Sequence, residues 1–286
     1  MKSHSEVAII LGAMPHEATR FKHFSAKSST HSTPISSLAQ TIILHPIADT
    51  RYDDTTLQIQ YEIGTELGVA TLLARVILSR AVLRISGAKL DFATNVLKRF
   101  SSFDFGYISS ESSLSEEELE NIAQSCEGAQ KCYIFLGNAF ACHKDKELIY
   151  EVLGLLSKVA DVQIFTNANA LDTLDTKEKF TDLAFLDRLE SSLEDLPESN
   201  GAFVYFTLEA LDSGDCKIYA TKQFVALAKN SDKITLKNPH KNTPCETSYQ
   251  IIEVPYLRGV VGVAQCSSQD VGVDFYPFYT LQSVRI

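Results

Sequence analysis

The sequence predicts an α/β protein, with parallel or mixed sheets and flanking helices, followed by a β-rich C-terminal part. Through the first two thirds of the chain, short apolar runs alternate with helix-compatible stretches. The clearest unit comprises an apolar run at 132–136, an amphipathic stretch at 144–160 and a second apolar run at 162–165. This spacing is typical of a right-handed βαβ unit with parallel strands. Beyond residue 200, short β-type runs are separated by the turn sequences SGD, NPHKN and YLRG.

Three strands are expected in the first third of the chain. The run VAIIL at 7–11 is continuously apolar, as in a strand buried on both faces. The run TIIL at 41–44 is followed by His45-Pro46, and the residue before a proline favours extended geometry. The stretch LQIQYEI at 57–63 alternates apolar and polar residues. We therefore expect helices on both faces of a parallel sheet.

Two helix starts carry capping chemistry. A mostly buried helix is predicted to begin at Thr65 or just after it, with Thr65 as N-cap. Glu66 would lie in the first turn, where a carboxylate complements the helix dipole. Further on, Ser115 and Glu118 form an S-x-x-E capping box. The acidic residues after Ser115 are therefore interpreted as helix-start chemistry and not as a metal site.

The changes in texture divide the chain into three regions. A first α/β lobe is expected over 1–110, and a second α/β lobe, which contains the βαβ unit, over 111–200. The β-rich part is expected over 201–286.

Composition excludes several classes of function. The chain has 286 residues, 45% of them hydrophobic, so it can bury a large core. Its net charge of −10 argues against a nucleic-acid partner, because phosphate binding needs a basic surface. No apolar run reaches the roughly 20 residues of a membrane span, and no secretory signal is recognised, so we expect a cytoplasmic protein.

No set of side chains indicates a metal site or a catalytic centre. The six cysteines include no C-x-x-C pair, which favours reduced thiols over iron–sulfur or zinc ligands. The seven histidines form no H-x-x-x-H or H-E-x-x-H pattern. Asp49, Asp53 and Asp54 lie close together but enclose Arg51, so we interpret them as a solvated loop. Cys142 and His143 are neighbours whose side chains would point apart, which disfavours a catalytic pair.

One turn lies where α/β folds bind ligands. Gly12-Ala13-Met14-Pro15 follows the first predicted strand, at its carboxyl end. It matches neither G-x-G-x-x-G nor the P-loop pattern, so from the residues alone a tight turn is favoured over a binding loop.

The order of three phrases gives a resemblance. GAMP at 12–15, HPIADT at 45–50 and YEIGTELGV at 61–69 occur in the order typical of molybdopterin oxidoreductases. More narrowly, the chain resembles the C-terminal part of the large iron–sulfur subunit of bacterial respiratory complex I. The stretches 6–80 and 111–170 carry most of this resemblance. It implies degenerate, molybdopterin-oxidoreductase-like Rossmannoid lobes, without the iron–sulfur part.

The departures from that family concern its cofactor. The resemblance places Gly12, Pro15, Gly64, Thr65 and Glu66 at a vestigial cofactor-binding position. Active members have Asn where this chain has Met14 and Asp where it has Glu66, and Met cannot supply the paired donor and acceptor of Asn. The resemblance therefore implies no cofactor, no metal and no catalytic residue.

Two functions from different classes follow. The first is a non-catalytic accessory subunit in the peripheral arm of a complex I-like NADH-quinone oxidoreductase. Its partners would be other subunits of that enzyme, and it would be peripheral to the inner membrane through them. The alternative is a stand-alone protein that binds a small molecule or nucleotide in a cleft near Gly12, Gly64 and Gly137. An active molybdenum enzyme is disfavoured by the short chain.

Overall fold

The computed structural model confirms the predicted fold class: a parallel sheet flanked by helices, and a second, mixed sheet in the C-terminal part. The described residues are 6–14, 40–50, 56–160, 162–166, 183–197, 201–207, 217–228, 234–237, 244–247, 250–265 and 276–281.

The first sheet has five parallel strands in the order β3-β2-β1-β4-β5. It takes three strands from the range 1–110 and two from 111–200. The predicted third strand ends early, because the chain turns after it towards the next helix. The strands are β1 (Glu6–Leu11), β2 (Gln40–Leu44), β3 (Thr56–Ile59), β4 (Lys131–Leu136) and β5 (Val162–Thr166).

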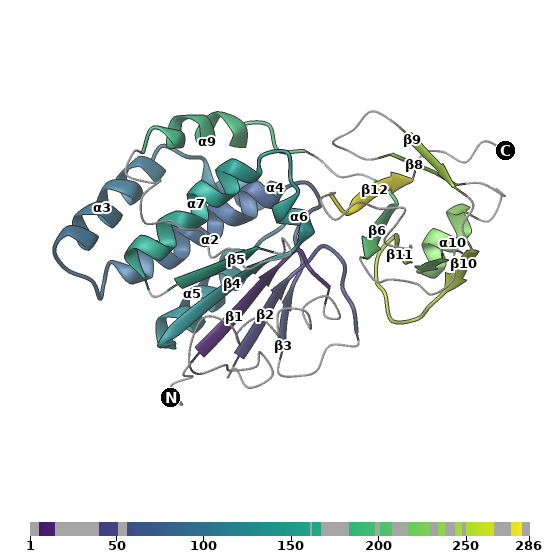
Figure 1. The fold of residues 1–286 in the computed structure, drawn as a ribbon, viewed down its shortest axis with the longest axis horizontal. Helices are drawn as coiled ribbons and strands as arrows, with labels where there is room; N and C mark the ends of the chain where they lie inside the picture. The colour runs from purple at the N-terminus through teal and green to yellow at the C-terminus, as the bar shows by residue number, and fades with distance from the viewer. Residues whose placement is uncertain are drawn as a thin grey trace.

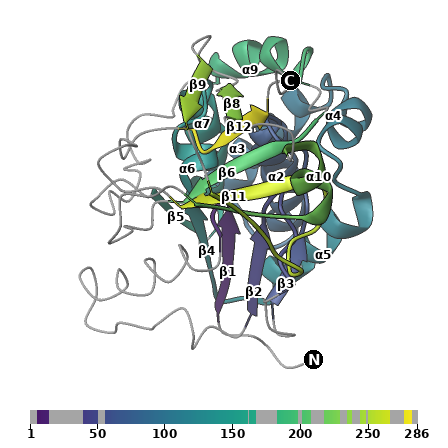
Figure 2. The ribbon, with the colours of Figure 1, turned by 90° about the vertical axis from the view of Figure 1, so that its right-hand side faces the viewer.

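The described helices of this part cover one face of the first sheet (Figures 1 and 2). Alternate residues of β1 point to opposite faces of the sheet. Val7, Ile9 and Leu11 lie on the face that packs against the helices and share one core cluster with them. Ala8 and Ile10 face the other side and are also buried. Within the described ranges that second face has no helix. The helices are α2 (Glu66–Ala81), α3 (Ala88–Phe100), α4 (Phe105–Glu111), α5 (Glu116–Gly128), α6 (Asn138–Ala141), α7 (Lys146–Val159) and α9 (Phe185–Leu193).

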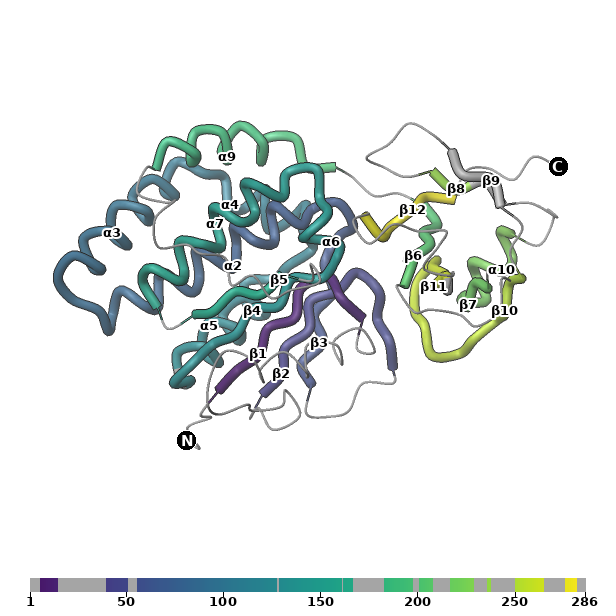
Figure 3. Tube along the Cα trace, viewed as in Figure 1, coloured from purple at the N-terminus to yellow at the C-terminus, as the bar shows by residue number. Residues whose placement is uncertain are grey.

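The predicted βαβ unit is present. β4 and β5 pair in parallel, and α7 connects them. The apolar residues of α7 face inward at the predicted positions, and in Figure 3 α9 lies along the outer side of the helical layer. The buried residues of α7 include Leu148, Ile149, Val152, Leu153, Leu155, Leu156 and Val159.

The second sheet has the strand order β10-β7-β11-β6-β12-β8-β9 and mixes parallel with antiparallel pairs. The sequence did not indicate α10, a short helix that follows β7 directly. The elements are β6 (Phe203–Thr207), β7 (Lys217–Ala220), α10 (Lys222–Ala228), β8 (Ile234–Lys237), β9 (Pro244–Thr247), β10 (Gln250–Glu253), β11 (Val261–Gln265) and β12 (Phe278–Leu281).

The two faces of β6 belong to different cores. Phe203 and Tyr205 pack into the large core that contains the first sheet and its helices. Val204 and Phe206 point the other way and pack in a smaller cluster with Phe224 of α10. The first and second sheets therefore share one continuous apolar core.

The second sheet lies across the carboxyl ends of the parallel strands of the first sheet (Figures 1 and 2). Asp49, in the loop after β2, forms an isolated antiparallel bridge with Leu257. The backbone N–H of Thr50 donates to the carbonyl oxygen of Tyr256 at 3.0 Å. The C-terminal part thus occupies the region where open α/β sheets usually hold ligands.

The capping box at the start of α5 gives a first prediction. The Ser115 hydroxyl accepts a hydrogen bond from the Glu118 backbone N–H at 3.2 Å, and the Glu118 carboxylate accepts from the Ser115 N–H at 2.9 Å. Ser115→Ala removes the first of these bonds, so we expect it to lower the free energy of unfolding by about 1 kcal/mol in urea denaturation. Ser125→Ala, within the same helix, is the control and should cost less. Equal losses would show that the cap does not stabilise the helix.

Candidate functional site

The centre of the first sheet is the point at which its strand order reverses direction, and in such sheets that point is the usual nucleotide site. β1 and β4 lie on either side of it and are followed directly by Gly12 and Gly137. The Gly137 N–H donates to the Leu11 carbonyl at 2.7 Å, and the Gly12 N–H donates to the Leu44 carbonyl at 2.9 Å. The backbone pairing therefore continues past the ends of the strands.

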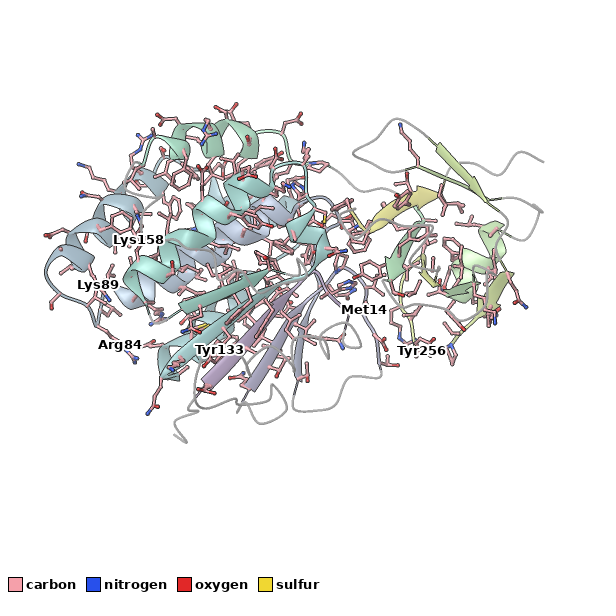
Figure 4. The ribbon with its side chains drawn as sticks, viewed as in Figure 1. Met14, Arg84, Lys89, Tyr133, Lys158 and Tyr256 are labelled. Atoms are coloured by element: carbon pink, nitrogen blue, oxygen red, sulfur yellow. The ribbon has the colours of Figure 1, made fainter. Side chains whose placement is uncertain are left out.

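The two glycine turns pack directly on one another. A Cβ on Gly137 would lie 2.4 Å from the Gly12 carbonyl oxygen. A Cβ on Gly12 would lie 2.6 Å from the Ala139 Cβ. Gly12 has a φ of +64°, which an L side chain rarely adopts. Met14, which follows in the same turn, is fully buried (Figure 4). Pro15, the remaining predicted residue of this turn, lies outside the described residues.

The Gly-Thr-Glu phrase forms the start of α2, as predicted, with Thr65 in the N-cap position. The prediction that the Thr65 side chain caps this helix is wrong. Its hydroxyl donates instead to the Glu62 carbonyl oxygen at 2.6 Å, so it ties the preceding turn together. Gly64 has a φ of +89°, and a Cβ there would lie 2.9 Å from Cγ of Pro197.

Glu66 is fully buried and lies among polar side chains from three regions of the chain. Its Oε1 accepts a hydrogen bond from the Tyr276 hydroxyl at 2.8 Å and a longer one from the Tyr61 hydroxyl at 3.5 Å. Its Oε2 lies 3.5 Å from Nε2 of His143. Tyr276 belongs to the C-terminal part, so the carboxyl group links the two parts of the molecule.

The hydrogen bonds of His143 define its tautomer. Its Nδ1 accepts from the backbone N–H of Asp145 at 3.0 Å, so the ring proton is assigned to Nε2. Nε2 then faces both the carbonyl oxygen of Gly64, at 3.4 Å, and Glu66. His143 thereby connects the turn before α2 to the segment between α6 and α7.

Burial changes the acid–base chemistry of this cluster. It raises the pKa of Glu66 from 4.5 to about 7, and the hydrogen bonds from Tyr276 and Tyr61 oppose that rise. Burial, followed by the Glu66 charge, also raises the pKa values of both tyrosines. Glu66 lies in the first turn of α2, as predicted, but the sequence did not indicate that its carboxyl group would be buried. The carboxyl group therefore keeps its proton to a higher pH than an exposed glutamate does.

His45, from the HPIAD phrase, makes a second link to the C-terminal part. Its ring packs edge-on against Tyr205, with 4.9 Å between ring centroids, and lies 5.7 Å from Phe278. Its Nδ1 accepts from the backbone N–H of Ile47 at 3.1 Å. Like Glu66, His45 holds the second sheet against the end of the first.

The site has the groups for proton exchange, but it is closed. Glu66 and His143 are at most 3% exposed, and both carboxylate oxygens of Glu66 face this chain's own side chains. A guanine edge would have to reach that carboxylate through Tyr276, and Met14 offers no polar pair. The residues present therefore do not fit the nucleotide end of a molybdopterin cofactor.

Sequence reasoning found half of this site. The structure brings Gly12 and Gly137 together, and places Gly64, Thr65 and Glu66 in one turn beside His143. The sequence did not indicate that Tyr61, His143 and Tyr276 would be partners of Glu66. Tyr276 is 210 residues from Glu66, and no local pattern relates them.

Within the described ranges, no group of three or more His, Cys, Asp or Glu residues is suited to a metal ion. The helices of those ranges also include none long and apolar enough to cross a membrane. A search against known protein families finds no match to the chain. A search of curated proteins finds no significant match either.

Proposed function

We propose that this chain is a cofactor-free accessory subunit of a complex I-like NADH-quinone oxidoreductase, in its peripheral arm. In this role it contributes surfaces for assembly and no catalytic residue of its own. It is cytoplasmic and reaches the inner membrane only through partner subunits.

The observation that carries this proposal is that the chain itself fills the end of the sheet where a nucleotide would bind. Gly12 and Gly137 are in close contact, and Glu66 accepts a hydrogen bond from Tyr276 of the C-terminal part. The order of GAMP, HPIAD and GTE supports a relationship to the large iron–sulfur subunit of complex I. Two of these phrases contact the C-terminal part, through Glu66 and His45. For Glu66 this contact supports a structural role at a position that binds cofactor elsewhere in that family.

The alternative, a nucleotide-binding cleft near Gly12, Gly64 and Gly137, requires space beside these glycines. At each of them an added Cβ would meet this chain at 2.9 Å or less. The described residues therefore favour the accessory role.

Co-purification tests the assembly role. A tagged chain, expressed in its native cells and recovered from detergent-solubilised membranes, should bring down other subunits of the quinone oxidoreductase in amounts comparable to its own. The same tag on an unrelated cytoplasmic protein is the control. Recovery of the chain without any such subunit would overturn the proposal.

A separate experiment tests the absence of a cofactor. The purified chain should have no visible absorption band, and its melting temperature should not change with guanine nucleotides or a pterin. A concentration-dependent rise would support the alternative, because a ligand stabilises the state that it binds. Loss of that rise in Glu66→Ala would then assign it to this site.

A further inference from the structure

The opposite end of the first sheet holds a pocket that the proposed function does not use. It has a volume of about 270 Å³ and lies between the C-terminal half of α2, the end of α5 and the first residues of β4 and β5. Figure 4 shows Arg84 and Lys89 at this end, far from Met14 and Tyr256. The pocket is therefore separate from the closed site around Glu66.

Two cysteines line this pocket side by side. Cys126 is in the last turn of α5 and Cys132 is the second residue of β4, and their Sγ atoms lie 3.4 Å apart. A disulfide bond of about 2.05 Å requires only a small further approach. Both thiols line the pocket, with Cys126 partly exposed and Cys132 buried.

The surroundings of the cysteine pair are cationic, although the chain as a whole has a net charge of −10. Arg80, Arg84, Lys89 and Lys131 line the pocket, against one carboxylate, that of Glu127. The Arg84–Glu127 ion pair, at 3.0 Å, and the Arg80–Glu120 ion pair neutralise part of this charge. The remaining cations, Lys89 and Lys131, attract anionic molecules.

We propose that Cys126 and Cys132 form a thiol–disulfide exchange site that takes small anionic disulfides, of which glutathione disulfide is the type. At about 270 Å³ the pocket lies just below the roughly 300–1,000 Å³ range of small-molecule sites, and its charge favours the anionic members of that class. The proposal is independent of the assembly role, since it concerns the isolated chain.

The reaction has two exchange steps. Cys126 Sγ gives up its proton and attacks one sulfur of the small disulfide, so that a mixed disulfide forms, the original S–S bond breaks and the departing sulfur takes up the proton as a thiol. The Cys132 thiol then gives up its proton and attacks Cys126 Sγ, which breaks the mixed disulfide and releases the second thiol. The two cysteines lose two electrons and the small disulfide gains them.

The asymmetry of the pair assigns these roles. Cys126 is the more accessible sulfur and meets the substrate first. The Cys132 thiol hydrogen-bonds with Cys126, and this contact and burial raise its pKa well above the usual range. Cys132 therefore stays protonated until the first exchange has brought the mixed disulfide next to it.

Peptide mapping tests the assignment. The reduced chain is treated with glutathione disulfide, quenched with acid, alkylated and cleaved with trypsin, which cuts after Lys131 and so separates the two cysteines. The expected product is a peptide containing Cys126 joined by a disulfide to the peptide containing Cys132. Because the latter peptide also contains Cys142, the Cys142→Ala variant is the control and should give the same link.

Single variants test the order of the steps. Cys132→Ala should accumulate a glutathione adduct at Cys126, whereas Cys126→Ala should form none at Cys132. Full alkylation of both cysteines in the treated wild-type chain would overturn the proposal. So would a disulfide that disappears in Cys142→Ala.

The charge of the substrate is tested with paired lysine variants. The double variant Lys89→Gln/Lys131→Gln should react with glutathione disulfide roughly threefold more slowly, and with uncharged hydroxyethyl disulfide at the wild-type rate. The matched control is Lys144→Gln/Lys146→Gln, near the start of α7, which should leave both rates unchanged. Equal rates of the first double variant and wild type with glutathione disulfide would overturn the preference for anions.

Discussion

Replacing Glu66 by Gln is expected to remove most of the fall in stability that the protein undergoes between about pH 5 and pH 8. In the folded chain burial raises the pKa of Glu66 from 4.5 to about 7. The folded state therefore binds more protons than the unfolded state between these values, and stability decreases as pH rises through them. The full contribution is present below the unfolded pKa and is lost above about pH 7. The difference between the folded and unfolded pKa values of Glu66 corresponds to about 3 kcal/mol of unfolding free energy.

Gln is the suitable probe because it keeps the shape of the protonated acid. Its oxygen can accept from Tyr276, and its amide group has the outline of the protonated carboxyl group without its charge. We therefore expect Glu66→Gln to match the wild type within about 1 kcal/mol near pH 5 and to be more stable by roughly 2 kcal/mol near pH 8. Urea denaturation at the two pH values measures both differences.

Two further variants complete the comparison. Glu66→Ala leaves the Tyr276 and Tyr61 hydroxyls without their acceptor and opens a cavity, so it should lose about 2–4 kcal/mol at both pH values. Glu147→Gln replaces an exposed carboxylate in the first turn of α7 and should keep the wild-type dependence on pH. If Glu66→Gln kept it too, Glu66 would not be the group that titrates.

The fold was predictable because its signals are local. The apolar run at 132–136 and the inward face of α7 each follow from a few neighbouring residues, and both predictions are confirmed. The capping box of Ser115 and Glu118 is equally local and is present with both of its bonds.

The site was only partly predictable because its partners are distant in sequence. Gly12 and Gly137 were both singled out as strand-end turns, but only the strand order brings them into contact. Thr65 was correctly placed at the helix start, yet its hydroxyl finds the Glu62 carbonyl first. The partnership of Glu66 with Tyr276 depends on how the second sheet lies across the first, which no local pattern specifies.

The cysteines were interpreted only as reduced, scattered thiols because their contact, too, depends on how the helices and strands pack. Cys126 and Cys132 are separated by five residues, a spacing that carries no motif. Their sulfurs meet because α5 ends just where β4 begins, so that the chain doubles back between them.

Substitution of Gly137 by Ala is the other change with a large expected effect. Gly137 has an ordinary φ of −75°, so an added methyl group causes no backbone strain there. It would, however, lie 2.4 Å from the Gly12 carbonyl oxygen and 2.6 Å from the Ala13 Cβ. Neither a backbone carbonyl nor a Cβ can rotate away, so the turns after β1 and β4 must separate. We expect Gly137→Ala to lower the free energy of unfolding by about 3 kcal/mol or more.

Two other glycines separate strain from crowding. Gly87 has a φ of +61°, and a Cβ added there would have no atom within 4 Å, so Gly87→Ala should cost only the backbone strain, about 1–2 kcal/mol. Gly12 combines a similar φ of +64° with a contact of 2.6 Å to the Ala139 Cβ. Gly12→Ala should therefore lower the free energy of unfolding, measured by urea denaturation, by about 1–3 kcal/mol more than Gly87→Ala does.

This series also bears on the proposed function. If Gly12→Ala and Gly87→Ala lost the same stability, and Gly137→Ala lost less than about 1 kcal/mol, the two turns would have room for added atoms. The carboxyl end of the sheet would then be open enough to admit a ligand, and the nucleotide-binding alternative would gain support. Large losses at Gly12 and Gly137, with a small loss at Gly87, would mean that contact between the two turns fills this end of the sheet. That outcome would favour the proposed accessory role over the nucleotide-binding alternative, because the space for a cofactor would be taken by the chain's own backbone.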